Sequence, residues 1–543
     1  MEFSGEAANR FPSRRRALSV MASGAAGVTA SVAFAGSARA VGGSGSVNSD
    51  TAPVVRTRQG QLEGFTADGV NKFLGVPFAQ PPVGELRWRA PKAPVPWSGV
   101  RTAQEFGPAA YQGPINASFR TDRVSEDCLY LNVWTTNLSK RARQPVVVWF
   151  HGGGNLRGAA SEMFTDGSSL AKLGVTVVAP NYRLGPFGFL NDEEMGANFA
   201  VLDHVAALRW VRENIEAFGG DPSRVLIFGY SAGAIEVRAL LQSPQAKGLF
   251  QRCALLSQGG ELPVSTEAWN FERSREATER IFSELGATNR SKLREVSAEA
   301  VYAAGFAASR VPTPAGGVFT PLDLVWNPVP DGEVVTEQFP AWSSGVPAMF
   351  ACCQHEGRSF LNPGVPYTSE TLRVMAESLA GPKADEVLRI LNLEGGTTFE
   401  SLDRLFTTVI FSEQEYASLR RFSGGDRKLY SYRFQRASPG RVQNNRLAHH
   451  GADIFYIFGN LLDSEFYPGG PYDAIDVQIR DEMQHAFVEF ARTGVPERLD
   501  GARWPEFGRS RSLHTVVNDQ VSFAPYDVDP VLESLYRLRP RVR

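Results

Sequence analysis

A five-residue segment, Gly229-Tyr230-Ser231-Ala232-Gly233, constrains the fold of this chain more than any other part of it. Residues 225 to 228 before it form an apolar run that is typical of a buried strand, and residues 234 to 241 after it have a helical pattern. A G-x-S-x-G segment between a strand and a helix makes a tight turn that lifts the serine hydroxyl above the edge of a sheet. We therefore expect a layered α/β fold with Ser231 as a candidate nucleophile, the alternative being an ordinary loop serine.

Four short apolar runs predict the middle strands of this sheet, and they cover residues 146–150, 175–179, 225–228 and 253–256. A helix is predicted between the second and third runs, because apolar residues recur every three or four positions from Val201 to Phe218. Gly219-Gly220, followed by Asp221-Pro222, ends that helix. Strands that alternate with helices indicate a mostly parallel sheet with helices on both faces.

Later segments extend the same prediction. Residues 348–353 and 428–434 are expected to form two more strands. Residues 262–345 and 365–425 are more helical and less regular, so we expect excursions over the sheet rather than separate domains.

Three successive glycines follow the first predicted strand, in His151-Gly152-Gly153-Gly154. Glycines let the backbone turn its N–H groups toward a ligand without a side chain in the way. Acyl transfer needs such donors around the oxyanion of the tetrahedral intermediate. Taken alone the segment is a structural glycine turn, but its place ahead of the G-x-S-x-G turn favours an oxyanion hole. Gly153, Gly154 and Ala232 are the candidate donors.

Longer motifs make the sequence similar to the type-B carboxylesterases, the cholinesterase and esterase/lipase branch of the α/β-hydrolases. The motifs are Phe73-Leu74-Gly75-Val76-Pro77-Phe78-Ala79, Ser125-Glu126-Asp127-Cys128-Leu129-Tyr130-Leu131-Asn132-Val133, Asn181-Tyr182-Arg183-Leu184-Gly185 and Phe218-Gly219-Gly220-Asp221-Pro222. The resemblance runs from about Pro53 almost to the C-terminus. It implies one α/β-hydrolase domain over residues 53–543, with large excursions that form a gorge.

The resemblance also implies a Ser-His-Glu catalytic triad of Ser231, Glu356 and His450. His450 lies in a His-Gly-x-acid segment and Glu356 follows the strand predicted to end at Cys353. His355 and His449 are the rival histidines next to these two positions. A buried carboxylate beside the base would hold the imidazole tautomer and stabilise the imidazolium.

Three residues near the implied triad depart from the family pattern. Tyr230 stands where Glu is usual, and Asp453 stands where Glu usually follows the histidine. Glu236 likewise replaces a common Ser after the nucleophile. We expect Tyr230 and Asp453 to belong to a rebuilt polar network around the base. Tyr230 would either supply a hydroxyl in place of the usual carboxylate or only pack.

The cysteines also depart from the family, in which a residue at the position of Cys128 often has a disulfide partner. The expected partner is missing from residues 107–111, so the loop is predicted to be unbridged. Cys352 and Cys353 are adjacent on a predicted strand, where neighbouring side chains face opposite ways. We expect two buried thiols there rather than a redox pair.

The N-terminal forty residues are predicted to be a signal peptide. Arg14-Arg15-Arg16 precede a modestly apolar stretch, and Ala38-Arg39-Ala40 supplies a small-residue cleavage site. Paired arginines with a weakly apolar middle resemble a twin-arginine export signal. Residues 1–40 are thus the signal, residues 41–52 a Gly/Ser-rich flexible lead-in, and the mature protein is secreted or extracytoplasmic. An uncleaved anchor or a disordered terminus is the alternative.

Charge and composition argue against a nucleic-acid partner and against stable insertion of the mature protein into a membrane. The chain has 56 Lys and Arg against 58 Asp and Glu, a net charge of −2 that argues against a basic nucleic-acid surface. Stable membrane insertion is not expected either, since the mature chain lacks an apolar stretch long enough to span a bilayer. No metal-ligand spacing is present, so no cofactor is predicted. The predicted partner is a small-molecule ester, and no oligomeric state is predicted.

Hydrolysis through an acyl-enzyme is the predicted reaction. The alternatives are an acyltransferase or cyclase that uses the same triad in biosynthesis, and a non-catalytic binding protein on the same fold. A binding protein is disfavoured because the serine, the acid and the histidine are all present.

Overall fold

The computed structural model describes residues 52–258, 271–286, 289–310, 313–337, 339–423, 427–463, 469–508 and 512–539. All of them belong to one compact unit, Ala52–Arg543. The predicted signal peptide and the lead-in up to residue 51 lie outside the described residues, so both stay predictions.

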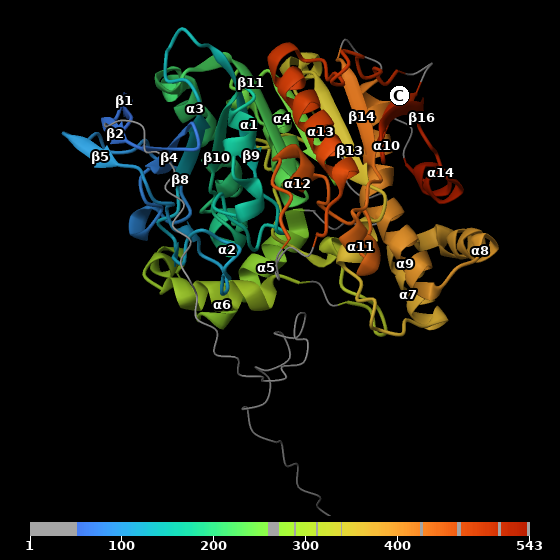
Figure 1. Cartoon of the computed structure of the whole chain (residues 1–543). Helices are drawn as coiled ribbons and strands as arrows, with labels where there is room; N and C mark the ends of the chain where they lie inside the picture. Colours follow the sequence, from blue (N-terminus) through green and yellow to red (C-terminus); the bar gives the residue numbers. More distant parts are fainter. Residues whose placement is uncertain are drawn as a thin grey trace, which may run out of the picture. The chain divides into compact units, whose positions relative to one another are not determined.

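One large mixed sheet organises the described part of the chain (Figure 1). From one edge to the other its strands are β16 (Val521–Pro525), β15 (Leu513–Val517), β14 (Leu429–Phe434), β13 (Ala348–Cys353), β12 (Arg252–Leu256), β11 (Gly220–Tyr230), β9 (Gln144–Phe150), β10 (Thr176–Pro180), β8 (Tyr130–Thr135), β4 (Val70–Pro77) and β3 (Phe65–Ala67).

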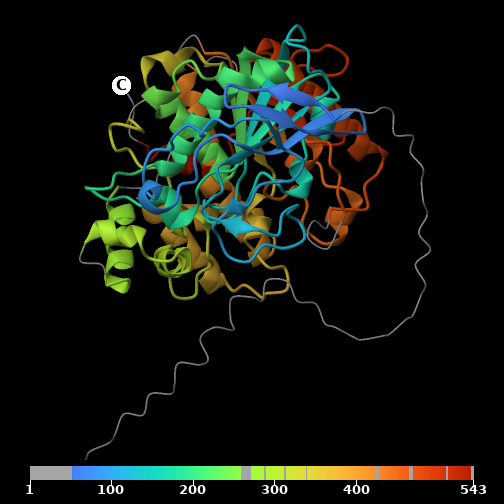
Figure 2. The same ribbon diagram turned by 90° about the vertical axis from the view of Figure 1, so that its left-hand side faces the viewer.

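The middle of this sheet, from β10 across β9, β11, β12, β13 and β14 to β15, is parallel, and both edges are antiparallel. The pairs β10–β9, β9–β11, β11–β12, β12–β13, β13–β14 and β14–β15 are parallel. The pairs β15–β16, β10–β8, β8–β4 and β4–β3 are antiparallel. Figure 2 views the sheet from the β3–β4 side. The prediction of a mostly parallel sheet is confirmed, and the antiparallel edges were not predicted.

Helices cover both faces of the sheet. Alternate side chains of each strand point to opposite faces, and since the central strands are apolar throughout, both faces must be buried. Phe150 and Ile227 pack in the core that contains α3 (Phe199–Asn214) and α4 (Ala232–Gln242). Trp149 and Phe228 pack in a second core on the other face. Its helices are α1 (Ser168–Ala171), α12 (Ile454–Ile457) and α13 (Ala474–Thr493).

The excursions are helical, as predicted. Their helices are α5 (Phe271–Glu284), α6 (Ala298–Ala308), α7 (Ser369–Ala380), α8 (Ala384–Glu394), α9 (Thr398–Phe406) and α10 (Glu413–Phe422). Helices α7 to α9 and the C-terminal α14 (Pro530–Tyr536) share a third core, which also contains Cys352. The remaining helices are α2 (Gly185–Phe189) and α11 (Pro439–Gln443), and the smaller sheets are β1 (Val54–Arg56) with β2 (Gln61–Glu63) and β5 (Val100–Thr102), and β6 (Ala109–Ala110) with β7 (Val124–Ser125).

Strand β11 begins earlier than the apolar run that predicted it. Gly220 pairs with Gln144 of β9, and the register then shifts before Val225. The Asp221 side chain fills this irregular segment, because its Oδ1 accepts a hydrogen bond from the Ser223 backbone and its Oδ2 contacts Arg143. Proline has no backbone N–H group, so it would leave a gap in a regular ladder of hydrogen bonds. Pro222 is tolerated here because the pairing is already irregular.

All four cysteines are buried and none is bonded to another. Cys352 lies in the core of the excursion and Cys353 in the core beside α12 and α13. The two neighbouring thiols therefore face opposite ways, as predicted. No helix among the described residues is long and apolar enough to cross a membrane.

Candidate active site

Ser231 lies in the turn between the end of β11 and the start of α4. Its φ of 55° and ψ of −127° belong to a region that side chains other than glycine rarely adopt. The turn approaches the end of β9 closely, since a Cβ on Gly233 would lie 2.1 Å from the carbonyl oxygen of Phe150. The same Cβ would lie 2.8 Å from the carbonyl oxygen of His151. The serine turn and the glycine loop are thus in direct contact.

The three candidate oxyanion donors belong to these two touching segments. Gly153 and Gly154 have φ values of 110° and 64°, which turn the backbone as only glycine does readily. Ala232 is the first residue of α4, where backbone N–H groups have no partner within the helix. Among the described residues, none accepts a hydrogen bond from the N–H groups of Gly153, Gly154 or Ala232. These donors are available to a ligand, and their role as an oxyanion hole stays a prediction.

Two buried aromatic rings, those of His151 and Tyr182, pack together at the start of the glycine loop. The Tyr182 hydroxyl donates a hydrogen bond of 2.9 Å to the carbonyl of His151, and the two rings stack with centroids 4.4 Å apart. Burial lowers the pKa of His151 to about 4, so its imidazole is neutral near pH 7. The first residue of the loop is therefore part of the core rather than a proton-transfer group.

Glu356 and His450 are brought together by segments far apart in the sequence. Oε2 of Glu356 lies 2.5 Å from Nδ1 of His450. Glu356 is fully buried, and its Oε1 accepts a 2.6 Å hydrogen bond from the backbone N–H of Cys353 at the end of β13. Nε2 of His450 is buried and has no hydrogen-bond partner among the described residues. The imidazole thus has one nitrogen on a carboxylate and one nitrogen available.

The two rival histidines have other partners. Nδ1 of His355 lies 2.8 Å from the Asp403 carboxylate, and Nδ1 of His449 lies 3.2 Å from the carbonyl of Leu447. Burial lowers the pKa of His449 to about 3. Neither ring is hydrogen-bonded to Glu356, which favours His450 as the base.

Tyr230 connects the serine turn with the loop of His450. Its ring stacks on Trp149 with centroids 5.7 Å apart and lies 5.6 Å from the ring of His450. A Cβ on Gly152 would lie 2.7 Å from this ring, and one on Gly451 would lie 2.8 Å from it. The ring therefore fills the space between the two glycine positions. These contacts support a packing role, and the proposed role of the hydroxyl stays a prediction.

Asp453 contacts the end of β13, the strand that precedes the acid. Its carboxylate accepts a 2.6 Å hydrogen bond from the Tyr432 hydroxyl, and its Oδ1 lies 3.6 Å from Sγ of Cys353. Cys353 in turn donates its backbone N–H to Glu356. Burial raises the pKa of Asp453 to about 6, and the negative charge of Glu356 adds to this shift. Cys353 therefore links the two acids: its thiol contacts Asp453 and its backbone N–H donates to Glu356.

A second buried pair, which the sequence did not suggest, lies between α3 and α4. Nε2 of His204 is 3.4 Å from Oε2 of Glu236, and both side chains are fully buried. Burial lowers the pKa of His204 to about 3 and raises that of Glu236 well above its usual value. In the sequence Glu236 stands out only as a departure from the family pattern, and a histidine on an apolar helix face does not indicate its partner.

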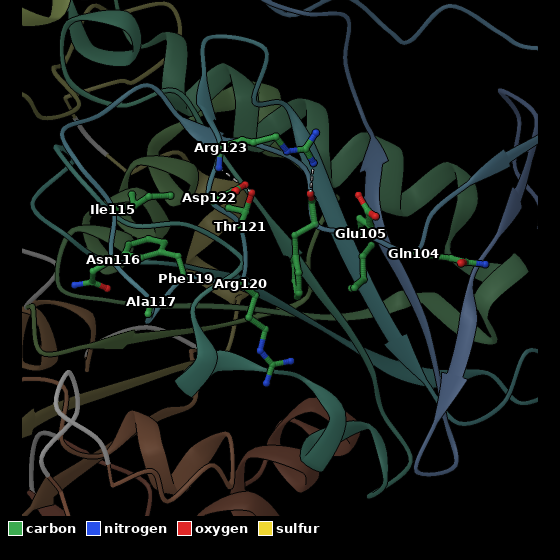
Figure 3. Close-up of a pocket in the computed structure, with 12 residues that line it drawn as sticks. Gln104, Glu105, Ile115, Asn116, Ala117, Phe119, Arg120, Thr121, Asp122 and Arg123 are labelled. Atoms are coloured by element: carbon green, nitrogen blue, oxygen red, sulfur yellow. Dashed lines mark hydrogen bonds between the residues drawn. The ribbon is translucent and has the colours of Figure 1, made fainter. Parts of the chain in front are cut away.

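A cavity of about 760 Å³ lies beside the loop of residues 115–123 (Figure 3). Arg123, which lines it, donates a 2.9 Å hydrogen bond to the carbonyl of Phe106. Ser231, Glu356 and His450 are not among its lining residues, so the predicted gorge over the triad stays a prediction. Among the described residues, no group of three or more His, Cys, Asp or Glu side chains is arranged to hold a metal ion.

Comparison with known proteins shows which family the chain belongs to. A model of the carboxylesterase family matches residues 51–527. The para-nitrobenzyl esterase of Bacillus subtilis is 33% identical over 510 residues, which are 90% of this chain and 99% of that protein. The fumonisin B1 esterase of Sphingopyxis macrogoltabida is 33% identical over 85% of this chain and 86% of its own. A carboxylesterase structure from Geobacillus stearothermophilus superimposes with a TM-score of 0.75 at 31% identity, covering 89% of this chain and 99% of that one.

The mixed sheet, with helices on both faces and a strained serine after a central strand, is the α/β-hydrolase fold. Within that class the chain belongs to the carboxylesterase family, the type-B carboxylesterases, and is a carboxylic-ester hydrolase. The fold class and the family resemblance inferred from the sequence are both confirmed.

Proposed function

We propose that the protein cleaves carboxylic esters through an acyl-enzyme on Ser231, with His450 as general base and Glu356 as the acid of the triad. The observation that supports this most is the 2.5 Å hydrogen bond between Glu356 and Nδ1 of His450, whose Nε2 has no partner among the described residues. A base that is fixed by a carboxylate and has its second nitrogen available is what nucleophile activation requires.

In the first step, the Ser231 hydroxyl attacks the ester carbonyl and gives its proton to Nε2 of His450. The N–H groups of Gly153, Gly154 and Ala232 stabilise the oxyanion, each contributing about 3 kcal/mol to the transition state. The imidazolium then protonates the leaving alcohol, and an acyl-enzyme remains.

In the second step, His450 takes a proton from water, which attacks the acyl-enzyme through a second oxyanion. Return of the proton to Ser231 releases the carboxylic acid. Glu356 keeps Nδ1 of His450 protonated in both steps and stabilises the imidazolium without taking its proton.

Replacement of the nucleophile tests this proposal. We expect Ser231→Ala to lower kcat for short p-nitrophenyl esters by at least ~10³-fold, since it removes the attacking oxygen. A fluorophosphonate should label the wild-type protein at Ser231 and leave the variant unlabelled, which also distinguishes an enzyme from a binding protein. Hydrolysis that persists in a folded Ser231→Ala variant would refute the mechanism.

Small-molecule esters are the proposed substrate class, and p-nitrobenzyl esters are the first probes because one relative is named for them. Product analysis with and without an added alcohol or amine distinguishes hydrolysis from acyl transfer. We also propose that the protein acts outside the cytoplasm, on the basis of the paired arginines and the cleavage pattern in residues 1–40.

A further inference from the structure

A buried aspartate of the excursion lies directly behind the loop of Glu356. Asp403 is on α9 and its side chain is 4% exposed. Its Oδ2 lies 2.8 Å from Nδ1 of His355 and accepts a 2.9 Å hydrogen bond from Nε of Arg358. One carboxylate oxygen thus binds the residues on either side of the Glu356-Gly357 pair.

The second oxygen of Asp403 reaches the same loop through Thr407. The Thr407 hydroxyl donates to Oδ1 of Asp403 at 3.3 Å and accepts a 3.1 Å hydrogen bond from the backbone N–H of Gly357. A Cβ on Gly357 would lie 2.7 Å from the carbonyl oxygen of Asp403, so the loop packs against the backbone of α9. The helix therefore holds residues 355, 357 and 358 and leaves Glu356 to face His450.

The two residues bonded to Asp403, His355 and Arg358, also join the acid loop to the segment that leads to His450, one through its backbone and one through its side chain. Nη1 of Arg358 donates a 2.9 Å hydrogen bond to the carbonyl of Asn445 and also contacts the Asn445 side-chain oxygen. The backbone N–H of His355 donates to the carbonyl of Ala448 at 2.9 Å. Asn445 and Leu447 have φ values of 57° and 50°, which surrounding contacts must enforce.

We propose that Asp403 is a positioning residue: through His355 and Arg358 it fixes the loop of Glu356 against the segment of His450. The inference rests on the proposed function, because it assigns Asp403 an effect on that catalytic pair. A misplacement of about 1 Å in such a pair costs roughly 100-fold in rate. A buried guanidinium without its carboxylate is unfavourable, so loss of the Asp403 charge will shift Arg358 and the loop with it.

The test replaces this carboxylate and, as a matched control, another buried carboxylate of the same excursion. We expect Asp403→Asn to lower kcat roughly 10- to 100-fold while KM changes less than about twofold. Glu413, 1% exposed, pairs with Arg539 at 2.6 Å, and no hydrogen bond or ion pair recorded among the described residues joins it to residues 355–358. Glu413→Gln should therefore leave kcat within about twofold of the wild type, although it also neutralises a buried ion pair.

A double mutant shows whether Asp403 acts through Glu356. In a Glu356→Gln background, Asp403→Asn should cause no further loss of kcat, whereas independent effects would multiply. The proton on Nδ1 of His450 gives a readout that needs no turnover. Its downfield NMR signal should be present in the wild type and in Ser231→Ala, and lost or shifted upfield in Asp403→Asn.

The outcomes separate this inference from the proposed function. An unchanged kcat in Asp403→Asn, the same fold-loss in the Glu356→Gln background, or an unchanged NMR signal would each overturn the role of Asp403. If the wild type lacks Ser231-dependent hydrolysis, the proposed function fails and the NMR signal alone decides the role of Asp403.

A milder pair of variants applies if Asp403→Asn does not fold. The His355 side chain is 31% exposed, so changes there are tolerated more easily. His355→Leu removes the donor to Asp403 and should lower kcat at least ~3-fold, while His355→Asn keeps a donor near the place of Nδ1 and should restore it. Equal kcat values in these two variants would contradict the inference.

Discussion

At the scale of single residues, two features near the site work against the stability of the folded state: a strained backbone conformation and a buried carboxyl group. Ser231 adopts a backbone conformation that costs about 1–3 kcal/mol, and hydrogen bonds from Ser231 N–H to the Leu256 carbonyl and from Ala234 N–H to the Ser231 carbonyl hold it there, both at 2.9 Å. Asp453 is an acid without exposure, so its ionisation also works against the folded state. Ser231 is the proposed nucleophile, and Asp453 contacts Cys353, whose backbone N–H donates to Glu356.

The raised pKa of Asp453 predicts the sign of a pH effect. Between about pH 4 and pH 6 the folded state keeps a proton that the unfolded state, with a pKa near 3.8, has lost. The contribution of Asp453 to the free energy of unfolding therefore falls as pH rises through this range and is constant above it. The full difference is about 3 kcal/mol, of which about 2 kcal/mol falls between pH 4.5 and pH 8.

Asp453→Asn should remove this dependence, because the amide does not ionise and still accepts from Tyr432. Urea unfolding at pH 4.5 and pH 8 measures the effect. We expect the variant to gain about 2 kcal/mol relative to the wild type on going from the lower to the higher pH. An equal difference between the two proteins at both pH values would show that Asp453 is ionised in the folded state throughout.

At the scale of elements, the serine turn depends on how closely α4 approaches β9. Gly229 and Gly233 both lie where a Cβ would collide with backbone, at 2.4 Å from Gly233 and at 2.1 Å from Phe150. Backbone atoms cannot give way as the end of a flexible side chain can. The two glycines of the motif are thus required by packing between elements, in addition to the tightness of the turn itself.

Gly233→Ala should consequently displace the start of α4 and lower both stability and activity. We expect a loss of about 2 kcal/mol in the free energy of unfolding, as for other overpacked cores, and a large fall in kcat. Gly345→Ala is the control, since a Cβ there meets nothing within 4 Å. Thermal unfolding and ester hydrolysis measure the two effects, and equal melting temperatures for the two variants would contradict the packing argument.

The elements differ in how well the sequence predicts them. Buried parallel strands such as β9 and β13 are continuous apolar runs, so their positions follow from hydrophobicity alone. Glu356 and His450 are 94 residues apart, and neither lies in a segment with a hydrophobic period, so only the family resemblance suggested them as a pair. Asp403 gave no signal at all, because a charged residue on an amphipathic helix usually faces solvent.

At the scale of the whole molecule, every residue assigned to the site lies within the unit Ala52–Arg543. The strands of the large sheet and the excursion helices that support the acid loop lie there too. We therefore expect residues 52–543 to be sufficient for catalysis and the residues before them to be needed only for export.

A protein that begins at residue 52 should keep its kcat for p-nitrophenyl esters within about twofold of the processed full-length protein, since it retains the entire sheet and site. The same protein should stay in the cytoplasm of a producing cell, whereas the full-length chain is exported. Fractionation and activity assays measure both properties. Loss of folding or activity in the shortened protein would show that the first 51 residues contribute to the catalytic unit.

Because all four cysteines are free and buried, the rate at which each thiol reacts with a reagent measures how often the structure around it opens. A thiol inside a core reacts with an alkylating reagent only after the surrounding structure opens, and burial raises the pKa of Cys253 to about 12, which further reduces its reactive thiolate fraction. Labelling rates at Cys128, Cys253, Cys352 and Cys353 would then rank the local opening of the sheet against that of the excursion core. Dithiothreitol should leave the melting temperature unchanged, because the folded chain has no cross-link for a reductant to break.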